Sequence, residues 1–254
     1  MDAPVFLVLF FVLGTVAASF VGVLAGRYAT EEGVLVGRSR CDACGKELAW
    51  WALVPIVSYV FARGRAVCCG VRLSAVAPVS EIALGALFVL SYLKLGLTPA
   101  LGFALIALSA LTALVLYDLA HQVLPPPFLG TFVVASLAAR IFEASSRYTL
   151  GVSLVVSAGI ALTLFALYVF SGGRALGFAD SPLALGLALL VGSSALPGFL
   201  FSFWVGAIIG IIMLARRPRG SRMGVEVPFA PFLAAGFLLA YFFISWNPFL
   251  IFFA

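Results

Sequence analysis

The sequence predicts an all-α polytopic membrane protein with about eight transmembrane helices and a small cysteine-containing insertion on the cytoplasmic side. Of its 254 residues, 64% are hydrophobic and only 10% are charged, and the mean hydropathy is +1.20. A soluble domain of this length needs far more polar surface than such a composition provides. The apolar residues form long continuous runs, whereas a β-barrel shows short segments of alternating polarity.

A helix needs roughly 20 predominantly apolar residues to cross the hydrocarbon core of a bilayer. The apolar runs predict eight spans, at residues 4–25, 76–94, 99–117, 128–143, 150–171, 182–196, 198–215 and 229–247. We place the break between the sixth and seventh spans at Pro197-Gly198, with a single kinked helix as the alternative. Asp2 stands where a signal peptide carries positive charge, so the first span is interpreted as an uncleaved helix.

The basic residues are distributed very unequally between the two sets of predicted loops. With the N-terminus outside, the cytoplasmic set holds Arg27, Arg38, Arg40, Lys46, Arg63, Arg65, Arg72, Arg174, Arg216, Arg217, Arg219 and Arg222. The opposite set holds only Lys94, Arg140 and Arg147. Because loops rich in Lys and Arg stay in the cytoplasm, this bias predicts an outside N-terminus. The net charge of +5 is therefore read as topology, with membrane lipid as the partner and no nucleic acid.

This topology divides the chain into a first transmembrane helix, a cytoplasmic domain and a membrane domain, at residues 1–26, 27–75 and 76–254. The cytoplasmic domain contains all the cysteines, which are Cys41, Cys44, Cys68 and Cys69. Cys41, Cys44 and Gly45 form a C-x-x-C-G knuckle that is typical of a zinc-binding turn. We interpret the four thiols as ligands of a structural zinc ion, with free thiols packed in a small domain as the alternative. The cytoplasm disfavours a disulfide framework.

Two aspartates lie at predicted membrane boundaries. Asp118 ends the third span, and Asp180 precedes a stretch without any charged residue from Ser181 to Ala215. Two crossings separate the aspartates, so both are expected at the cytoplasmic boundary. Paired carboxylates repel, so that one holds a proton near neutral pH while the other is ionised. Such a pair can hydrolyse a peptide bond or relay protons in a transporter, and helix capping by Asp180 is a third interpretation.

Six segments of the chain follow one another in an informative order. They are ASFVGVLAGR (18–27), SRCDACGKELAWWALVPIVSYVFARGR (39–65), APVSEIALGALF (77–88), YDLAHQVLP (117–125), GFAD (177–180) and EVPFAPFLAAG (226–236). In this order and spacing, the sequence resembles the prepilin peptidases (type IV leader peptidases), which are membrane aspartyl proteases with a GxGD motif. The resemblance covers nearly the whole chain.

The resemblance implies that Asp118 and Asp180 are the catalytic pair and that 76–254 is a peptidase domain. The implied reaction is removal of the short basic leader from type IV prepilins or type II secretion pseudopilins, at the cytoplasmic face of the prokaryotic inner membrane. Many members of this family then methylate the new N-terminus with S-adenosylmethionine. The alternatives are a transporter that uses Asp118 and Asp180 as proton relays, and a catalytically inactive peptidase homologue.

Three positions depart from the pattern of that family. Ala179 replaces the second glycine of GxGD, and a requirement for positive φ there would disfavour alanine by about 1 kcal/mol. Pro182 stands where the family usually has a lysine, although a proline is well tolerated at the start of a helix. Ala66 stands where the second cysteine pair is expected to begin, which leaves Cys68 and Cys69 adjacent. Adjacent cysteines make it awkward for both to bind one zinc ion.

Overall fold

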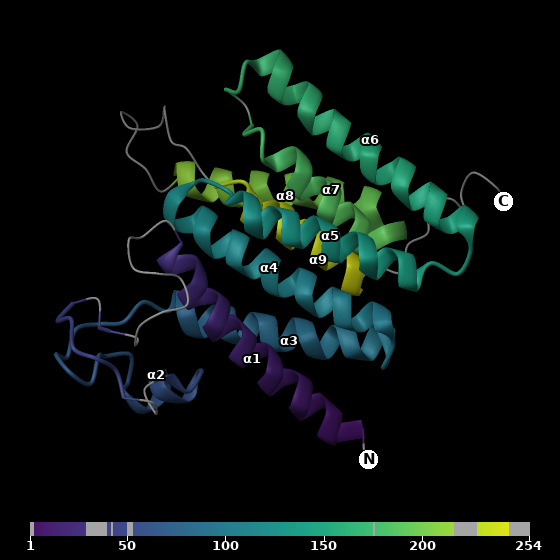
Figure 1. Cartoon of the computed structure of the whole chain (residues 1–254). Coiled ribbons are helices and arrows are strands. Elements are labelled where there is room, and N and C mark those ends of the chain that lie inside the picture. The colour runs from purple at the N-terminus through teal and green to yellow at the C-terminus, as the bar shows by residue number, and fades with distance from the viewer. Residues whose placement is uncertain are drawn as a thin grey trace. The chain divides into compact units, whose positions relative to one another are not determined.

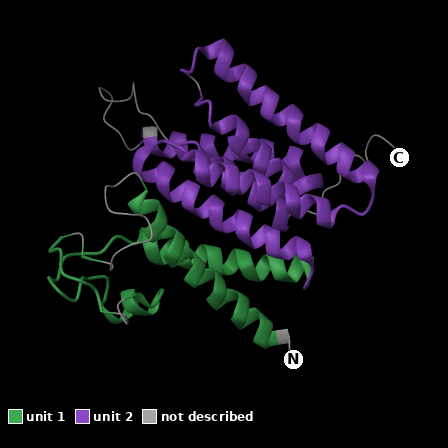
Figure 2. Cartoon of the chain, in the orientation of Figure 1, with its two compact units in different colours: residues 1–96 green, residues 97–254 purple. Residues whose placement is uncertain are grey.

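The computed structural model describes residues 3–28, 40–41, 43–49, 53–174, 176–215 and 228–243. Within these ranges the regular secondary structure is helical apart from isolated bridges, which confirms the predicted all-α fold class. The chain divides into two compact units, residues 1–96 and residues 97–254 (Figure 2). The basic segment at 216–222 and the end of the last predicted span, beyond residue 243, lie outside the described residues.

Unit 1 is built around two long apolar helices, α1 (Ala3–Arg27) and α3 (Val76–Leu95), which pack against each other (Figure 1). Their backbones approach closely where two glycines meet. A Cβ placed on Gly14 would lie 2.7 Å from the Cα of Gly85, which leaves no room for a larger residue. Small residues allow membrane helices to pack this tightly.

The segment between α1 and α3 contains little regular structure. It includes the short helix α2 (Val57–Phe61) and two isolated bridges, one from Arg40 to Glu47 and one from Arg65 to Arg72. Parts of the predicted cytoplasmic domain, namely residues 29–39, 42 and 50–52, lie outside the described residues.

Unit 2 is a bundle of consecutive helices. They are α4 (Pro99–His121), α5 (Pro126–Glu143), α6 (Arg147–Ser171), α7 (Asp180–Val191), the 3₁₀ turn η2 (Gly192–Ser194), α8 (Ala195–Ala215) and α9 (Ala230–Phe243). Local sequence explains several starts: the Thr98 side chain caps α4, and Ser146 and Thr149 form a capping box on α6. The helices run back and forth, so the end of α4 and the starts of α7 and α9 lie at one end of the unit, on the left in Figure 1.

Among the residues that the structure describes, five helical segments are long and apolar enough to cross a membrane. They are Pro4–Arg27, Val76–Leu95, Pro99–His121, Arg147–Ser171 and Asp180–Met213. The helix Ala230–Phe243 is apolar but shorter. These segments support the predicted membrane fold. The last long segment contains α7, η2 and α8, which correspond to the sixth and seventh predicted spans.

The break between α7 and α8 lies earlier than the predicted Pro197-Gly198. The α-helix is interrupted at Gly192–Ser194, where Gly192 has a positive φ of 59°. Glycine adopts this conformation without steric cost. Pro197 lies in the first turn of α8, where a helix does not need the N–H that proline lacks.

Helix α7 lies at the centre of unit 2 and is buried along most of its length. Leu183, Leu187 and Ala188 are fully buried, and α7 packs against α5, α6, α8 and α9. The Phe132 side chain of α5 fills the space beside Gly186, where a Cβ would lie 2.6 Å from the ring. The position of α7 is therefore closely defined by its neighbours.

Candidate active site and metal centre

Asp118 is a buried carboxylate near the end of α4, with only 6% of its surface exposed. Its Oδ2 accepts a hydrogen bond of 3.2 Å from the backbone N–H of Ala230, the first residue of α9. The first N–H groups of a helix have no intrahelical acceptor, and the helix start attracts negative charge. The start of α9 therefore holds the Asp118 carboxylate in place.

Asp180 is the first residue of α7 and is 8% exposed. Its Oδ2 accepts a hydrogen bond of 2.9 Å from the N–H of Gly177, and its own N–H donates to the carbonyl of Gly177 at 3.2 Å. These two bonds close the turn that leads into α7. The next residue, Ser181, donates its hydroxyl to the carbonyl of Ala161 on α6 at 2.8 Å, which fixes the first turn of α7.

The alanine that departs from the GxGD pattern is not strained. Ala179 has φ −69° and ψ −16°, a right-handed conformation that any L-residue adopts easily. Position 179 does not require positive φ, so alanine carries no backbone penalty there. Pro182 lies in the first turn of α7, where it is well tolerated as predicted.

The structure places Asp118 and Asp180 in the same unit, near the end of α4 and at the start of α7. Each carboxylate is buried and is held by one backbone N–H. Two buried carboxylates at one end of a helical bundle can divide the roles of acid and base if one is ionised and the other protonated. The sequence did not indicate the donors on Gly177 and Ala230, because backbone N–H groups carry no residue-type signal. His121 is exposed at the end of α4, and its ring contacts that of Tyr117 in a tilted arrangement, with ring centres 4.4 Å apart.

In unit 1, Glu81 is a buried acidic group. It lies on α3, accepts a hydrogen bond of 2.7 Å from the N–H of Ile56 and is hydrogen-bonded to Ser19 of α1. Ile56 has a φ of 58°, which is unusual for a β-branched residue. Glu81 therefore ties the segment between α1 and α3 to both helices.

The four cysteine sulfur atoms form a cluster in which all lie within 4.8 Å of one another. The sulfur atoms of Cys44 and Cys68 are 3.3 Å apart, and those of Cys41 and Cys69 are 3.8 Å apart. The thiols that the sequence grouped as metal ligands are thus close together, even though Cys68 and Cys69 are adjacent.

Two similar turns carry these cysteines. Gly45 donates its N–H to the carbonyl of Cys41 at 2.8 Å, and Gly70 donates to the carbonyl of Ala66 at 2.7 Å. Both glycines have a positive φ, of 69° and 70°. Ala66 therefore takes the place of Cys41 in the second turn, and the missing thiol comes from Cys68.

The first turn also favours the form of cysteine that binds metals. Backbone N–H groups of Cys44 and Ala43 hydrogen-bond to the Cys41 sulfur and lower the pKa of this thiol to about 6. At neutral pH the thiolate therefore prevails, and the thiolate is the metal ligand.

Unit 1 contains a cavity of about 570 Å³ beside the cysteine cluster. Its lining includes basic and acidic side chains, among them Arg40, Arg65, Arg72 and Glu81. Guanidinium groups bind carboxylates and phosphates, whereas a carboxylate attracts a cationic group. The cavity is chemically suited to a small ligand that carries both charges.

Known proteins resemble this chain over most of its length. The family described as Bacterial Peptidase A24 N-terminal domain matches residues 12–95. A relative from Myxococcus xanthus (strain DK1622) is 32% identical, over 83% of this chain and 64% of the relative. A relative from Dichelobacter nodosus is 33% identical, over 81% of this chain and 71% of the relative. A relative from Bacillus subtilis (strain 168) is 28% identical, over 91% of this chain and 92% of the relative. All three are named prepilin leader peptidase/N-methyltransferase. No solved structure matches the chain.

Proposed function

Because the chain belongs to the prepilin leader peptidase/N-methyltransferase family, we propose that it is a membrane aspartyl endopeptidase that removes the leader from type IV prepilins or pseudopilins. The observation that carries this proposal is the placement of Asp118 and Asp180, two buried carboxylates at the end of α4 and the start of α7 in one helical unit. Leader removal assayed with purified protein and a prepilin tests it, and the aspartate variants decide the mechanism.

In the proposed reaction, the two aspartates add a water molecule across the peptide bond. The ionised carboxylate takes a proton from the water as its oxygen attacks the scissile carbonyl carbon. The protonated carboxyl group donates its proton to the carbonyl oxygen, which gives a tetrahedral gem-diol. The C–N bond then breaks: the first carboxyl group passes the proton it took from water to the leaving amine, and the second carboxylate takes a proton back from a gem-diol hydroxyl as the new carboxylic acid forms. The N–H groups of Ala230 and Gly177 hold the two side chains at fixed positions, which reduces the reorganisation that the reaction needs.

The distribution of basic residues supports a cytoplasmic active site. Twelve of the fifteen Lys and Arg residues fall in one set of predicted loops, which is expected in the cytoplasm. The end of α4, with Asp118, and the start of α7, with Asp180, lie at one end of unit 2, as expected if both face the cytoplasm. A substrate with an apolar helix in the membrane and a basic leader in the cytoplasm would present its cleavage site at this boundary. A transporter that uses the same carboxylates is the rival proposal, and it predicts proton flux without any cleavage.

We further propose that the cysteine cluster binds one structural zinc ion through Cys41, Cys44, Cys68 and Cys69. Zinc takes four thiolates at about 2.3 Å in a tetrahedron, which places the sulfur atoms about 3.8 Å apart. The observed separations, from 3.3 to 3.9 Å for the pairs in contact, fit this geometry. A bound zinc ion would stabilise a segment that has little regular structure of its own.

The purified full-length protein is expected to contain about one zinc per chain, measured by inductively coupled plasma mass spectrometry. Cys44→Ser and Cys69→Ser should each lose most of this zinc, since a hydroxyl is a poor zinc ligand. A matched control moves one thiol within the second turn by combining Cys68→Ser with Ala66→Cys. This double variant should retain the metal, because position 66 in the second turn corresponds to Cys41 in the first turn. Natively folded protein without metal would contradict the proposal.

The cavity of unit 1 supports methylation as a second function. Relatives carry N-methyltransferase in their name, and we propose that S-adenosylmethionine binds in this cavity. Arg40, Arg65 and Arg72 would hold its carboxylate, and Glu81 would face its cationic groups. When bound, S-adenosylmethionine supplies an activated methyl group for the amine that cleavage releases.

Equilibrium binding of radiolabelled S-adenosylmethionine to the purified protein tests this placement. Arg72→Gln should weaken binding about tenfold, because it removes one charge-assisted contact to the carboxylate. Arg63→Gln is the matched control, since Arg63 is exposed in the same segment and does not line the cavity. Equal affinity of both variants and the unchanged protein would place the ligand elsewhere.

A further inference from the structure

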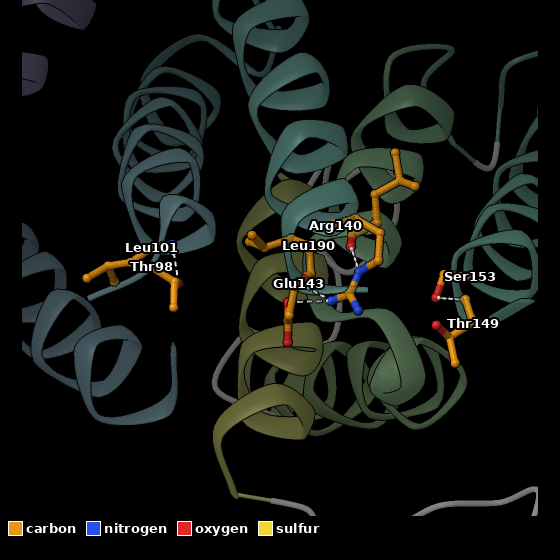
Figure 3. A network of polar contacts seen from close by, with 8 residues as sticks. Thr98, Leu101, Arg140, Glu143, Thr149, Ser153 and Leu190 are labelled. Atoms are coloured by element: carbon orange, nitrogen blue, oxygen red, sulfur yellow. Dashed lines mark hydrogen bonds and ion pairs between the residues drawn. The ribbon is translucent and has the colours of Figure 1, made fainter. Parts of the chain in front are cut away.

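Arg140 is a buried arginine in the last turn of α5, with 8% of its surface exposed. Its Nε donates to the carbonyl oxygen of Leu189 at 3.0 Å, and its Nη2 donates to that of Leu190 at 3.2 Å. The same Nη2 forms an ion pair of 2.8 Å with Glu143 (Figure 3). The guanidinium is therefore bonded to two backbone carbonyls of α7 and to one carboxylate of its own helix, α5.

The carbonyl groups that Arg140 binds belong to the last turn of α7. Carbonyls in this turn have no intrahelical partner, and a cation at this end of a helix is favourable. Gly192 leaves room for the guanidinium because it has no side chain: a Cβ at this position would overlap the guanidinium group. A positive φ of 59° at Gly192 turns the backbone away directly after α7. Arg140 and Gly192 together determine where α7 ends.

The other end of α7 is Asp180. The helix has 12 residues and is about 18 Å long, and its continuous backbone hydrogen bonds connect its last turn to Asp180. Phe132 of α5 fills the space beside Gly186 in the middle of this helix, and Ser181 bonds to α6 at its start. Arg140 is the hydrogen-bonding anchor at the far end.

We propose that Arg140 is a positioning residue for Asp180. By holding the last turn of α7, it sets the rotation and the axial position of the helix, and thereby the location of the Asp180 carboxylate relative to Asp118. This inference rests on the proposed aspartyl mechanism. A misplacement of about 1 Å in a catalytic group can reduce a rate about 100-fold, so a small shift of α7 has a measurable effect. A buried charge is costly in a membrane protein, which argues against simple space filling.

The test compares variants of the purified full-length protein in leader removal from a prepilin. Arg140→Gln should lower kcat about tenfold or more, with KM within twofold, because substrate binding surfaces are unchanged. Arg140→Lys should recover part of kcat, since an ammonium group can still donate to both carbonyls. Gly192→Ala should also lower kcat, because its Cβ overlaps the guanidinium and the positive φ of this position disfavours alanine, so that both effects disturb the end of α7 while the charge of Arg140 remains. Arg147→Gln is the matched control, an exposed arginine outside this network, and should behave as the unchanged protein.

Hydrogen–deuterium exchange provides a readout that does not depend on activity. In Arg140→Gln, exchange in residues 176–185 should rise, although these residues are at the opposite end of α7. Unchanged kcat and unchanged exchange there would overturn the inference, even if the variant melts at a lower temperature. If Arg140→Gln does not fold, Arg140→Lys and Gly192→Ala give the same two readouts. A protein that cleaves no prepilin at all would refute the proposed function, while exchange would still report whether Arg140 fixes the turn of Asp180.

Discussion

Asp118→Asn and Asp180→Asn are each expected to abolish leader removal, with kcat/KM lowered by roughly 10³-fold or more. Asparagine has nearly the same shape as aspartate and keeps an oxygen that accepts from the N–H of Ala230 or Gly177. It cannot exchange a proton near neutral pH, and general acid–base catalysis contributes 10²- to 10⁴-fold. Since the two groups act as one unit, their effects are not additive, and the double variant should lose no more activity than either single variant.

The measurement is the electrophoretic shift of a cognate prepilin, first in cells and then with purified protein. His121→Ala is the control, because His121 is exposed and contacts the ring of Tyr117. This variant should keep processing within twofold of the unchanged protein. Full processing by either aspartate variant would refute the catalytic pair. The transporter would be favoured if the unchanged protein cleaves no prepilin but conducts protons in vesicles, and if the aspartate variants lose this proton flux.

Most of the helices follow from local sequence. The length and apolar character of a segment such as 76–95 decide that it is a helix long enough for a membrane, and Ser146 with Thr149 marks the start of α6. The break between α7 and α8 was misplaced because Pro197 is the more conspicuous helix breaker. In the structure, Pro197 is accommodated in a first turn, and Gly192 with its positive φ makes the break.

The candidate site was predictable only in part. The positions of Asp118 and Asp180 at span ends follow from the charge pattern and from the family resemblance. Their hydrogen-bond donors were not predictable, because they are backbone groups and one of them, on Ala230, is remote in sequence. Arg140 was read only as a topology signal, since its burial against α7 depends on tertiary packing that sequence spacing does not reveal.

Ala230→Pro is expected to reduce leader removal about 10- to 100-fold while α9 still forms. Ala230 is the first residue of α9, where the fixed φ of proline matches the helix and no intrahelical bond is lost, although its ring adds volume at a fully buried position. The substitution removes the N–H that donates to Oδ2 of Asp118 at 3.2 Å. A hydrogen bond to a charged group contributes about 1.5–3 kcal/mol, which corresponds to this range of rate loss.

Ala230→Gly is the control that changes the side chain at this position but keeps the N–H. Glycine keeps the donor and removes only the methyl group, so its kcat should stay much closer to that of the unchanged protein. Thermal unfolding of both variants shows whether α9 and the bundle remain intact. If Ala230→Pro cleaves as fast as Ala230→Gly at equal stability, the start of α9 does not hold a catalytic carboxylate. A loss confined to the proline variant would identify the backbone of residue 230 as the group that positions Asp118.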